Sequence, residues 1–277
     1  MNKVTNAIKK EQKLTVGEDF LKSTVALEKM KVIISGASGK MGKVLESVLK
    51  DKNDCEIVAG IDRKASIGNS FKIFANVCKV DADADVIIDF SHPDLLNPLL
   101  NFAKEKKIPI VLCTTGYSEE QVELIQEYSK VIPIFYSRNM SFGINLLIEL
   151  SRKATKVLGD NFDIEIIEKH HNQKIDAPSG TALMIADVIS SVLNKEINYV
   201  YDRHEKRTKR TKSEIGIHSV RGGTIVGEHE VIFAGEDEVI TISHSAQSKR
   251  VFAIGAVNAA KFLKDKHPGL YDMKDLL

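Results

Sequence analysis

The densest group of chemically active side chains in this chain of 277 residues lies between positions 168 and 181. The segment reads Glu-Lys-His-His-Asn-Gln-Lys-Ile-Asp-Ala-Pro-Ser-Gly-Thr, which places His170, His171 and Lys174 within five positions. A ligand with two carboxylates needs cationic partners, because each charge-assisted hydrogen bond contributes about 1.5–3 kcal/mol. His171 and Lys174 would supply them, and His170 is then free to donate a proton near neutral pH. A solvated loop is the alternative interpretation of this pattern.

The end of the same segment is typical of the start of a helix. Ser179 and Thr181 are residues that occur at helix N-termini, and Gly180 lets a ligand oxygen come close to the backbone. The helix dipole adds only about 0.3–1 kcal/mol to anion binding, so the cationic side chains must contribute most. Ser179 is disfavoured as a nucleophile, since no G-x-S-x-G sequence surrounds it. A metal site is also disfavoured, because H-E-x-x-H and supporting Cys or carboxylate spacings are missing.

A glycine-rich sequence forms the second candidate site. After the apolar run Val32–Ser35 the chain reads Gly36, Ala37, Ser38, Gly39, Lys40, Met41 and Gly42, a G-x-x-G-x-x-G pattern. Glycines of this spacing allow a tight turn and bring a pyrophosphate close to the N–H groups that open a helix. A phosphate-binding P-loop is excluded, because Lys43 is followed by Val44. A chance glycine turn is the alternative.

An acidic residue follows this loop at the spacing expected for ribose binding. Asp62 ends the second apolar run, twenty residues beyond Gly42, where a carboxylate can bind the adenosine ribose hydroxyls. Asp62 favours NADH, whereas Arg63 and Lys64 are able to pair with the 2′-phosphate of NADPH. We therefore expect the protein to use both cofactors. The alternative is that Asp62 is a turn residue.

Two more polar segments follow apolar runs and complete the candidate site. They are Cys113-Thr114-Thr115-Gly116 and Ser137-Arg138-Asn139-Met140. Ligands of α/β sheets bind at the carboxyl ends of strands, so both segments are candidates for contact with the cofactor. Ordinary turn chemistry explains them equally well.

The elements that must position these residues follow from the apolar pattern. Five short apolar runs alternate with helical patterns near 40–50, 94–106 and 118–129; the runs are Val32–Ser35, Ile57–Ile61, Val86–Phe90, Ile108–Cys113 and Ile132–Tyr136. Continuous hydrophobicity of this kind predicts a Rossmann-type, doubly wound parallel sheet.

After Asn139 the rhythm changes. A helix at Ser141–Leu158, a strand at Phe162–Lys169 and a helix from Ser179 precede strand patterns at Glu214–Val220, His229–Phe233 and Glu238–His244. This predicts a second, α+β domain with a mostly open, mixed or antiparallel sheet. The helical pattern Arg250–Leu263 can pack back on the first domain. The expected units are an extension at 1–29, a dinucleotide-binding domain at 30–139 completed by 249–277, and a substrate-binding and oligomerisation domain at 140–248.

Composition limits the possible partners. Lys and Arg total 39 against 38 Asp and Glu, so no overall field steers the chain toward nucleic acid or a membrane. No apolar run approaches the roughly 18–20 residues that span a bilayer. Three widely spaced cysteines predict reduced thiols and a cytosolic location. Residues 1–29 lack the pattern of a signal or transit peptide, so we expect a non-essential extension, or an upstream start codon with Met30 as the working start.

A basic run offers a competing function. Its residues are Arg203, Lys206, Arg207, Lys209, Arg210 and Lys212. Asp202, Glu205 and Glu214 bracket it and aromatic residues are few, so we favour a solvated loop over a nucleic-acid patch.

Taken together, these sequences resemble the 4-hydroxy-tetrahydrodipicolinate reductases, also called dihydrodipicolinate reductases, of bacterial diaminopimelate and lysine biosynthesis. The resemblance runs from about Met30 to the C-terminus. It is carried by the sequences at 36–42, 113–116 and 168–182, by Ser-Val-Arg-Gly-Gly at 219–223, by Gly-Glu-His-Glu-Val at 227–231 and by Phe-Ala-Ile-Gly-Ala at 252–256. The 168–182 sequence is highly specific to that family, whereas the glycine loop is not.

The resemblance implies a role for each candidate residue. Gly36 to Met41 would hold the cofactor pyrophosphate, and Asp62 with Arg63 the ribose. The nicotinamide side would be lined by Cys113, Thr114, Thr115, Ser137, Arg138, Asn139 and Met140. His170 would be the catalytic acid and Lys174 a second proton donor and carboxylate partner. The substrate would also contact His171, Ser179, Gly180 and Thr181. Cys113 departs from the family, since many relatives have glycine there.

The resemblance also implies an NADH- or NADPH-dependent reductase of a small dicarboxylate that assembles as a homotetramer through its second domain. Two other functions compete with it. Another nicotinamide-dependent dehydrogenase would share the first domain, but would not call for His-His-x-x-Lys before Ser-Gly-Thr. A dinucleotide-sensing regulator would require a DNA-binding helix-turn-helix, and the sequence shows none.

Overall fold

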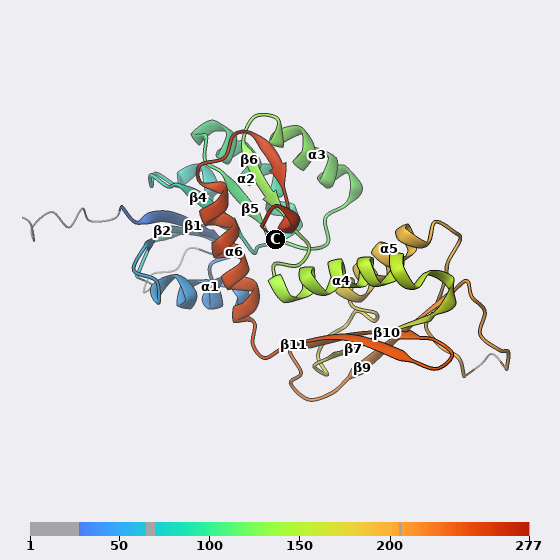
Figure 1. Cartoon of the computed structure of the whole chain (residues 1–277). Helices are drawn as coiled ribbons and strands as arrows, with labels where there is room; N and C mark the ends of the chain where they lie inside the picture. Colours follow the sequence, from blue (N-terminus) through green and yellow to red (C-terminus); the bar gives the residue numbers. More distant parts are fainter. Residues whose placement is uncertain (1–27, 65–69, 205–206, 277) are drawn as a thin grey trace, which may run out of the picture.

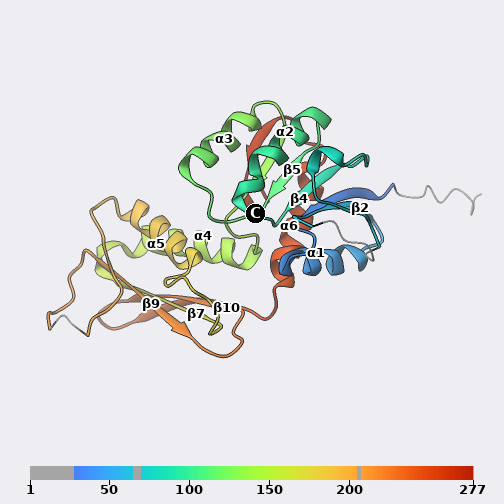
Figure 2. The same ribbon diagram turned by 180° about the vertical axis from the view of Figure 1, so that it is seen from behind.

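The structure is a computed structural model that describes residues 28–64, 70–204 and 207–276. It contains two β-sheets, each covered by helices (Figures 1 and 2). The expected extension at 1–29 lies outside the described residues except for its last two positions. Lys206 of the basic run lies outside them as well.

The first sheet contains seven parallel strands. They are β1 (Met30–Ser35), β2 (Cys55–Ile61), β3 (Ile73–Phe74), β4 (Val86–Asp89), β5 (Ile110–Leu112), β6 (Pro133–Tyr136) and β12 (Gly269–Tyr271). Their order is β12-β6-β5-β4-β1-β2-β3. The strand order therefore reverses at β1, which lies between β4 and β2. A crevice at the carboxyl ends of the strands beside such a reversal is where sheets of this kind bind nucleotides.

Helices cover both faces of this sheet. They are α1 (Lys40–Lys50), α2 (Leu96–Lys106), α3 (Glu119–Ser129) and α6 (Arg250–Leu263). Side chains of α1 and α6 share one core with alternate residues of β1 and β4, and those of α2 and α3 share the core on the opposite face. The return of α6 to the first sheet is visible in Figure 1, where it crosses beside α1.

The second sheet contains five strands and is mixed. They are β7 (Asp163–His170), β8 (Asn198–Val200), β9 (Glu214–Arg221), β10 (Gly227–Ala234) and β11 (Val239–Ala246), in the order β11-β10-β7-β9-β8. Pairs involving β10 are antiparallel, whereas β7, β9 and β8 run parallel. Helices α4 (Phe142–Leu158) and α5 (Gly180–Leu193) pack on one face only. The predicted fold class, a Rossmann-type sheet with a second α+β unit, is confirmed.

Most of the predicted elements are present, with ends shifted by one or two residues. The sequence reasoning missed β3, β8 and β12 because two or three residues are too few to form a recognisable pattern. Short 3-10 helices lie at η2 (Val77–Lys79), η3 (Pro93–Leu95), η4 (Gly159–Asn161) and η5 (Met273–Leu276). Among the described residues, no helix combines the length and the apolar composition that crossing a membrane requires.

Candidate active site

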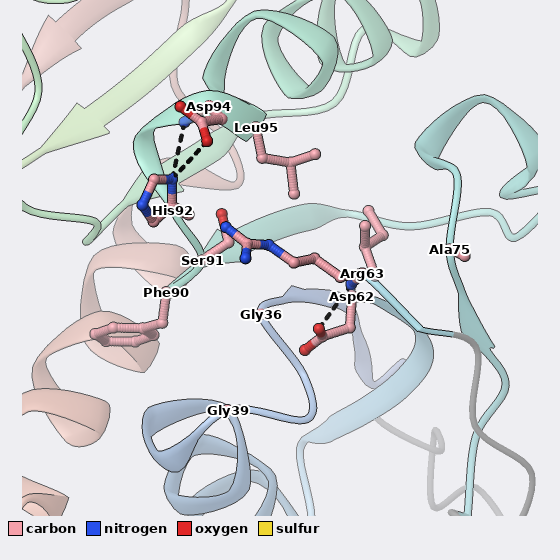
Figure 3. Close-up of a pocket in the computed structure, with 11 residues that line it drawn as sticks. Gly36, Gly39, Asp62, Arg63, Ala75, Phe90, Ser91, His92, Asp94 and Leu95 are labelled. Carbon is pink, nitrogen blue, oxygen red and sulfur yellow. Dashed lines mark hydrogen bonds and ion pairs between the residues drawn. The ribbon is translucent and has the colours of Figure 1, made fainter.

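The glycine loop forms one wall of a cavity of about 680 Å³ at the carboxyl ends of β1, β2 and β4 (Figure 3). Gly36 has φ +78°, and a Cβ there would lie 2.5 Å from the carbonyl oxygen of Phe90. A Cβ on Gly42 would lie 2.2 Å from the carbonyl oxygen of Gly36. Glycine is therefore required at both positions, and the resulting concave backbone suits the pyrophosphate of a dinucleotide.

Asp62 and Arg63 line the same cavity. The Asp62 carboxylate accepts a 2.8 Å hydrogen bond from the backbone N–H of Ser38 and one of 2.7 Å from that of Arg63. The carboxylate thus supports the glycine loop and is also exposed to the cavity. Figure 3 shows the Arg63 side chain reaching toward Ser91, so a cation lies within the same cavity as the carboxylate.

The other predicted cofactor residues differ in their surroundings. Ala37 is buried in the core, whereas Lys40 and Met41 open α1. Cys113 and Thr114 are buried and are not among the residues lining the cavity, and burial raises the pKa of the Cys113 thiol well above its ordinary value. The Thr114 hydroxyl donates a 2.7 Å hydrogen bond to Asp89, which is itself buried at the end of β4.

A second cavity, of about 540 Å³, lies between the two units and brings together residues predicted from separate segments. The first unit contributes Thr115, Gly116, Tyr117, Tyr136 and Arg138, and the second contributes His170, Lys174, Ser179, Gly180 and Thr181. His171 is not among the residues lining this cavity; its carbonyl oxygen accepts a hydrogen bond from the Lys174 N–H. Lys174 itself forms a 2.8 Å ion pair with Asp176.

The segment before α4 contacts the second cavity from the first unit. The Asn139 side-chain amide donates a 3.0 Å hydrogen bond to the Thr181 hydroxyl, which joins a predicted cofactor residue to a predicted substrate residue. The Ser137 hydroxyl donates to the carbonyl oxygen of Asn139. Met140 is buried, and its carbonyl oxygen lies where a Cβ on Gly255 of α6 would be.

Glu168 lies behind the second cavity and contacts two of its lining residues, His170 and Ser179, although sequence reasoning gave it no role. Its carboxylate is completely buried and accepts hydrogen bonds from His170 Nδ1 at 2.6 Å and from the Ser179 N–H at 3.1 Å. Arg221 donates two more, at 2.7 and 2.8 Å. Burial alone would raise the pKa of Glu168, but the bonds from Arg221 and His170 outweigh it and lower the pKa to about 2. The two-residue period of a strand, which puts Glu168 and His170 on one face, was the available signal.

Two histidine rings meet beside this carboxylate. Burial lowers the pKa of His170, and the hydrogen bond that His170 donates to Glu168 opposes that shift only in part. The His229 ring lies edge-on to His170, with centroids 5.2 Å apart, and its Nε2 is 3.1 Å from the Ser179 hydroxyl. Burial lowers the pKa of His229 to about 3, so this ring is neutral at neutral pH.

These features place an imidazole next to the open start of a helix. Ser179 accepts a hydrogen bond from the Ala182 N–H and caps α5, and a Cβ on Gly180 would meet nothing within 4 Å. The backbone at Gly180 is therefore open to a ligand. Among the described residues, no group of three or more His, Cys, Asp or Glu side chains is arranged to hold a metal ion.

Two family models cover nearly all of the described chain. The model for "Dihydrodipicolinate reductase, N-terminus" matches residues 30–140, and that for "Dihydrodipicolinate reductase, C-terminus" matches residues 143–277. The matched regions include both cavities.

Individual relatives of this chain are named as reductases of the same family. The chain is 55% identical over 248 residues to a 4-hydroxy-tetrahydrodipicolinate reductase of Caldanaerobacter subterraneus subsp. tengcongensis, covering 90% of this chain and 98% of that protein. It is 50% identical to a reductase of the same name from Clostridium tetani, with 90% and 97% coverage. The dipicolinate-bound dihydrodipicolinate reductase from Paenisporosarcina sp. TG-14 matches with a TM-score of 0.75 at 25% identity, over 90% of this chain and 100% of that one.

Proposed function

This chain belongs to the dihydrodipicolinate reductase family, and from that premise we propose that it reduces 4-hydroxy-tetrahydrodipicolinate to tetrahydrodipicolinate with loss of water. The reaction serves diaminopimelate and lysine biosynthesis, and NADH or NADPH is the reductant. The observation that carries the proposal is the second cavity. Its walls combine Thr115 and Arg138, at strand ends of the nucleotide-binding sheet, with His170, Lys174 and Gly180.

The cofactor would bind across the first unit. The backbone from Gly36 to Met41 would hold the pyrophosphate, and the close backbone packing that only glycine allows at positions 36 and 42 supports this. The loops containing Cys113, Thr114 and Thr115 and containing Ser137, Arg138, Asn139 and Met140 would line the nicotinamide side. The bound dihydronicotinamide supplies the hydride of the reaction; the chain's own residues position the substrate and handle its protons.

The substrate would lie in the second cavity. Ser179, Gly180 and Thr181 would bind one carboxylate at the start of α5, and Lys174 would bind the other. His171 would contribute from the edge of the site, since it does not line the cavity. His170 would donate a proton through Nε2, because its Nδ1 is held by Glu168.

Cofactor choice is proposed to be dual. Asp62 favours the free ribose hydroxyls of NADH, and Arg63 in the same cavity can pair with the 2′-phosphate of NADPH.

Three broader features remain proposals. The functional units are 30–139 completed by 249–277, and 140–248, a division supported by the packing of α6 on α1 and by β12 in the first sheet. A homotetramer joined through the second sheet is supported by exposed apolar side chains such as Val220 and Val239 on its uncovered face. A cytosolic location is supported by three free cysteines.

A coupled assay tests the function. The unstable hydroxy-dicarboxylate is generated in situ from its aldehyde and pyruvate precursors by the corresponding synthase, and the oxidation of NADH and of NADPH is followed separately. We expect both cofactors to be consumed only when the synthase and both precursors are present. Absence of synthase-dependent oxidation with either cofactor would refute the proposed reaction.

A further inference from the structure

We propose that Glu168, held by Arg221, is the positioning residue of the second cavity: it fixes which ring nitrogen of His170 carries hydrogen and anchors the start of α5. This inference deepens the proposed function and rests on it, because it assigns the groups that make the proton donor competent. It concerns a carboxylate with no exposed surface, which cannot itself touch the substrate.

The Glu168 carboxylate accepts hydrogen bonds from four donors in three elements. Oε2 accepts from His170 Nδ1 and from one Arg221 nitrogen, and Oε1 accepts from the second Arg221 nitrogen and from the Ser179 N–H. Strands β7 and β9 run parallel here, with His170 paired to Arg221 in the register. Two neighbouring strands and the first turn of α5 therefore converge on one buried anion, which is stable only because each oxygen is satisfied.

This arrangement determines the tautomer of His170. An ionised carboxylate accepts hydrogen bonds but donates none, so the 2.6 Å contact requires a hydrogen on His170 Nδ1. In the neutral ring Nε2 is then the free acceptor, and it takes up the proton that His170 delivers. Had the hydrogen been on Nε2, Nδ1 would face Glu168 lone pair to lone pair.

The same pair links the proton donor to the substrate-binding segment. One Arg221 nitrogen that contacts Glu168 also donates a 2.6 Å hydrogen bond to the carbonyl oxygen of Asp176, in the loop between His170 and α5. Glu168 binds the other end of that loop through the Ser179 N–H. The Glu168–Arg221 ion pair thus contacts both ends of the segment between His170 and Gly180.

The charged groups facing His170 predict opposite effects for the two partners. Glu168 favours the protonated ring, whereas Lys174 and Arg221 disfavour it. The His229 ring, which lies edge-on to His170, is neutral, and Asp176 is paired with Lys174. Glu168→Gln should therefore lower the pKa of His170 further, and Arg221→Met should raise it. Damage to the fold alone would not move the two variants in opposite directions.

The first test measures the tautomer directly and requires no turnover. We record 15N spectra of the full-length protein labelled on histidine, and assign His170 by the signals missing from His170→Gln. We expect a protonated Nδ1 and an unprotonated Nε2 in the wild-type protein at neutral pH. In Glu168→Gln the side-chain amide can donate to Nδ1, so we expect the hydrogen on Nε2. A wild-type ring with hydrogen on Nε2, or the same tautomer in both proteins, overturns the proposal.

The second test is the dependence of kcat on pH. Loss of the correct tautomer should lower kcat of Glu168→Gln about a hundred-fold, within the usual contribution of a general acid. The alkaline limb of the kcat profile should move to lower pH in Glu168→Gln and to higher pH in Arg221→Met. Glu168→Asp keeps the charge, so its profile should return toward that of the wild type. Shifts in the same direction, or an unchanged limb in both variants, overturn the assignment.

A matched control lies on the other face of the same strand. Glu165 also contacts a histidine and arginines, His218 at 2.8 Å and Arg203 and Arg210 at 3.1 Å. Glu165→Gln breaks a comparable cluster and should leave the pH profile unchanged. If wild-type enzyme fails the coupled assay while the tautomer result holds, the proposed function fails and the positioning of His170 stands.

Discussion

The Asn139 side-chain amide and the Thr181 hydroxyl, 42 positions apart in the chain, are joined by a 3.0 Å hydrogen bond. One residue belongs to the loop at the end of the nucleotide-binding sheet and the other to the first turn of α5. The bond therefore connects the walls on which cofactor and substrate would lie.

We expect this bond to couple the two walls energetically. Asn139→Ala and Thr181→Val should each raise the substrate KM. The loss of binding free energy in the double variant should be smaller than the sum of the two single losses by about 0.5–1.5 kcal/mol, because either change removes the same bond. Steady-state kinetics on the cycle measure this. Asn97→Ala, an exposed amide on α2, serves as the control. Strict additivity would show that the contact has no role in substrate binding.

Lys174→Ala should lower kcat by about 10²–10⁴-fold while NADH binding, followed by its fluorescence, persists. Lys174 lines the second cavity, where its ammonium would serve both substrate carboxylate and proton transfer. Lys130→Ala removes an exposed ammonium, paired with Glu127 at the end of α3 and not among the residues lining the second cavity, and should leave turnover unchanged. Normal turnover in Lys174→Ala would remove Lys174 from the mechanism.

Asp62→Ala should weaken the use of NADH more than that of NADPH, since the carboxylate favours ribose hydroxyls and repels a 2′-phosphate. The Asp62 side chain also accepts a hydrogen bond from the Ser38 N–H, so we expect some loss of activity with both cofactors. Asp62→Asn keeps an oxygen acceptor without the charge and should shift the ratio of kcat/KM values toward NADPH with a smaller general loss. Equal losses for both cofactors in both variants would argue against ribose recognition.

Gly180→Ala should separate folding from substrate binding. A Cβ there meets nothing within 4 Å, and alanine favours the helical conformation over glycine, so the unfolding temperature should stay equal or rise. The methyl group would nevertheless occupy the backbone surface on which a carboxylate is proposed to lie, and the substrate KM should increase about ten-fold or more. An unchanged KM would place the carboxylate elsewhere.

His229 should make the protein less stable in acid. Its folded pKa of about 3 lies below the ordinary value of 6.5, so its contribution is complete above pH 6.5 and is lost as the pH falls toward 3. His229→Gln removes this titration. Thermal unfolding between pH 7.5 and 4 should show a shallower decline for the variant than for wild type. Parallel declines would indicate that His229 titrates normally in the folded protein.

The sequence by itself determined the fold class and most elements. Strands that are buried on both faces have a continuous apolar pattern, and this pattern can be recognised without knowing which strands are adjacent. It also located the candidate chemistry in 168–181 and 36–42, where function depends on local backbone geometry. The sharp turn at Gly36 and the capped helix start at Ser179 are local features, and residue type indicates them directly.

Only the tertiary structure decided which of these groups lie together. Arg221 reaches Glu168 because β9 lies parallel to β7, and His229 reaches Ser179 because β10 pairs with β7 on its other side. These partners lie 53 and 50 positions apart. Strand order and register depend on the packing of the whole unit, and no local pattern encodes them. The sequence therefore predicted which residue donates the proton, whereas the fold supplied the buried carboxylate that we propose orients it.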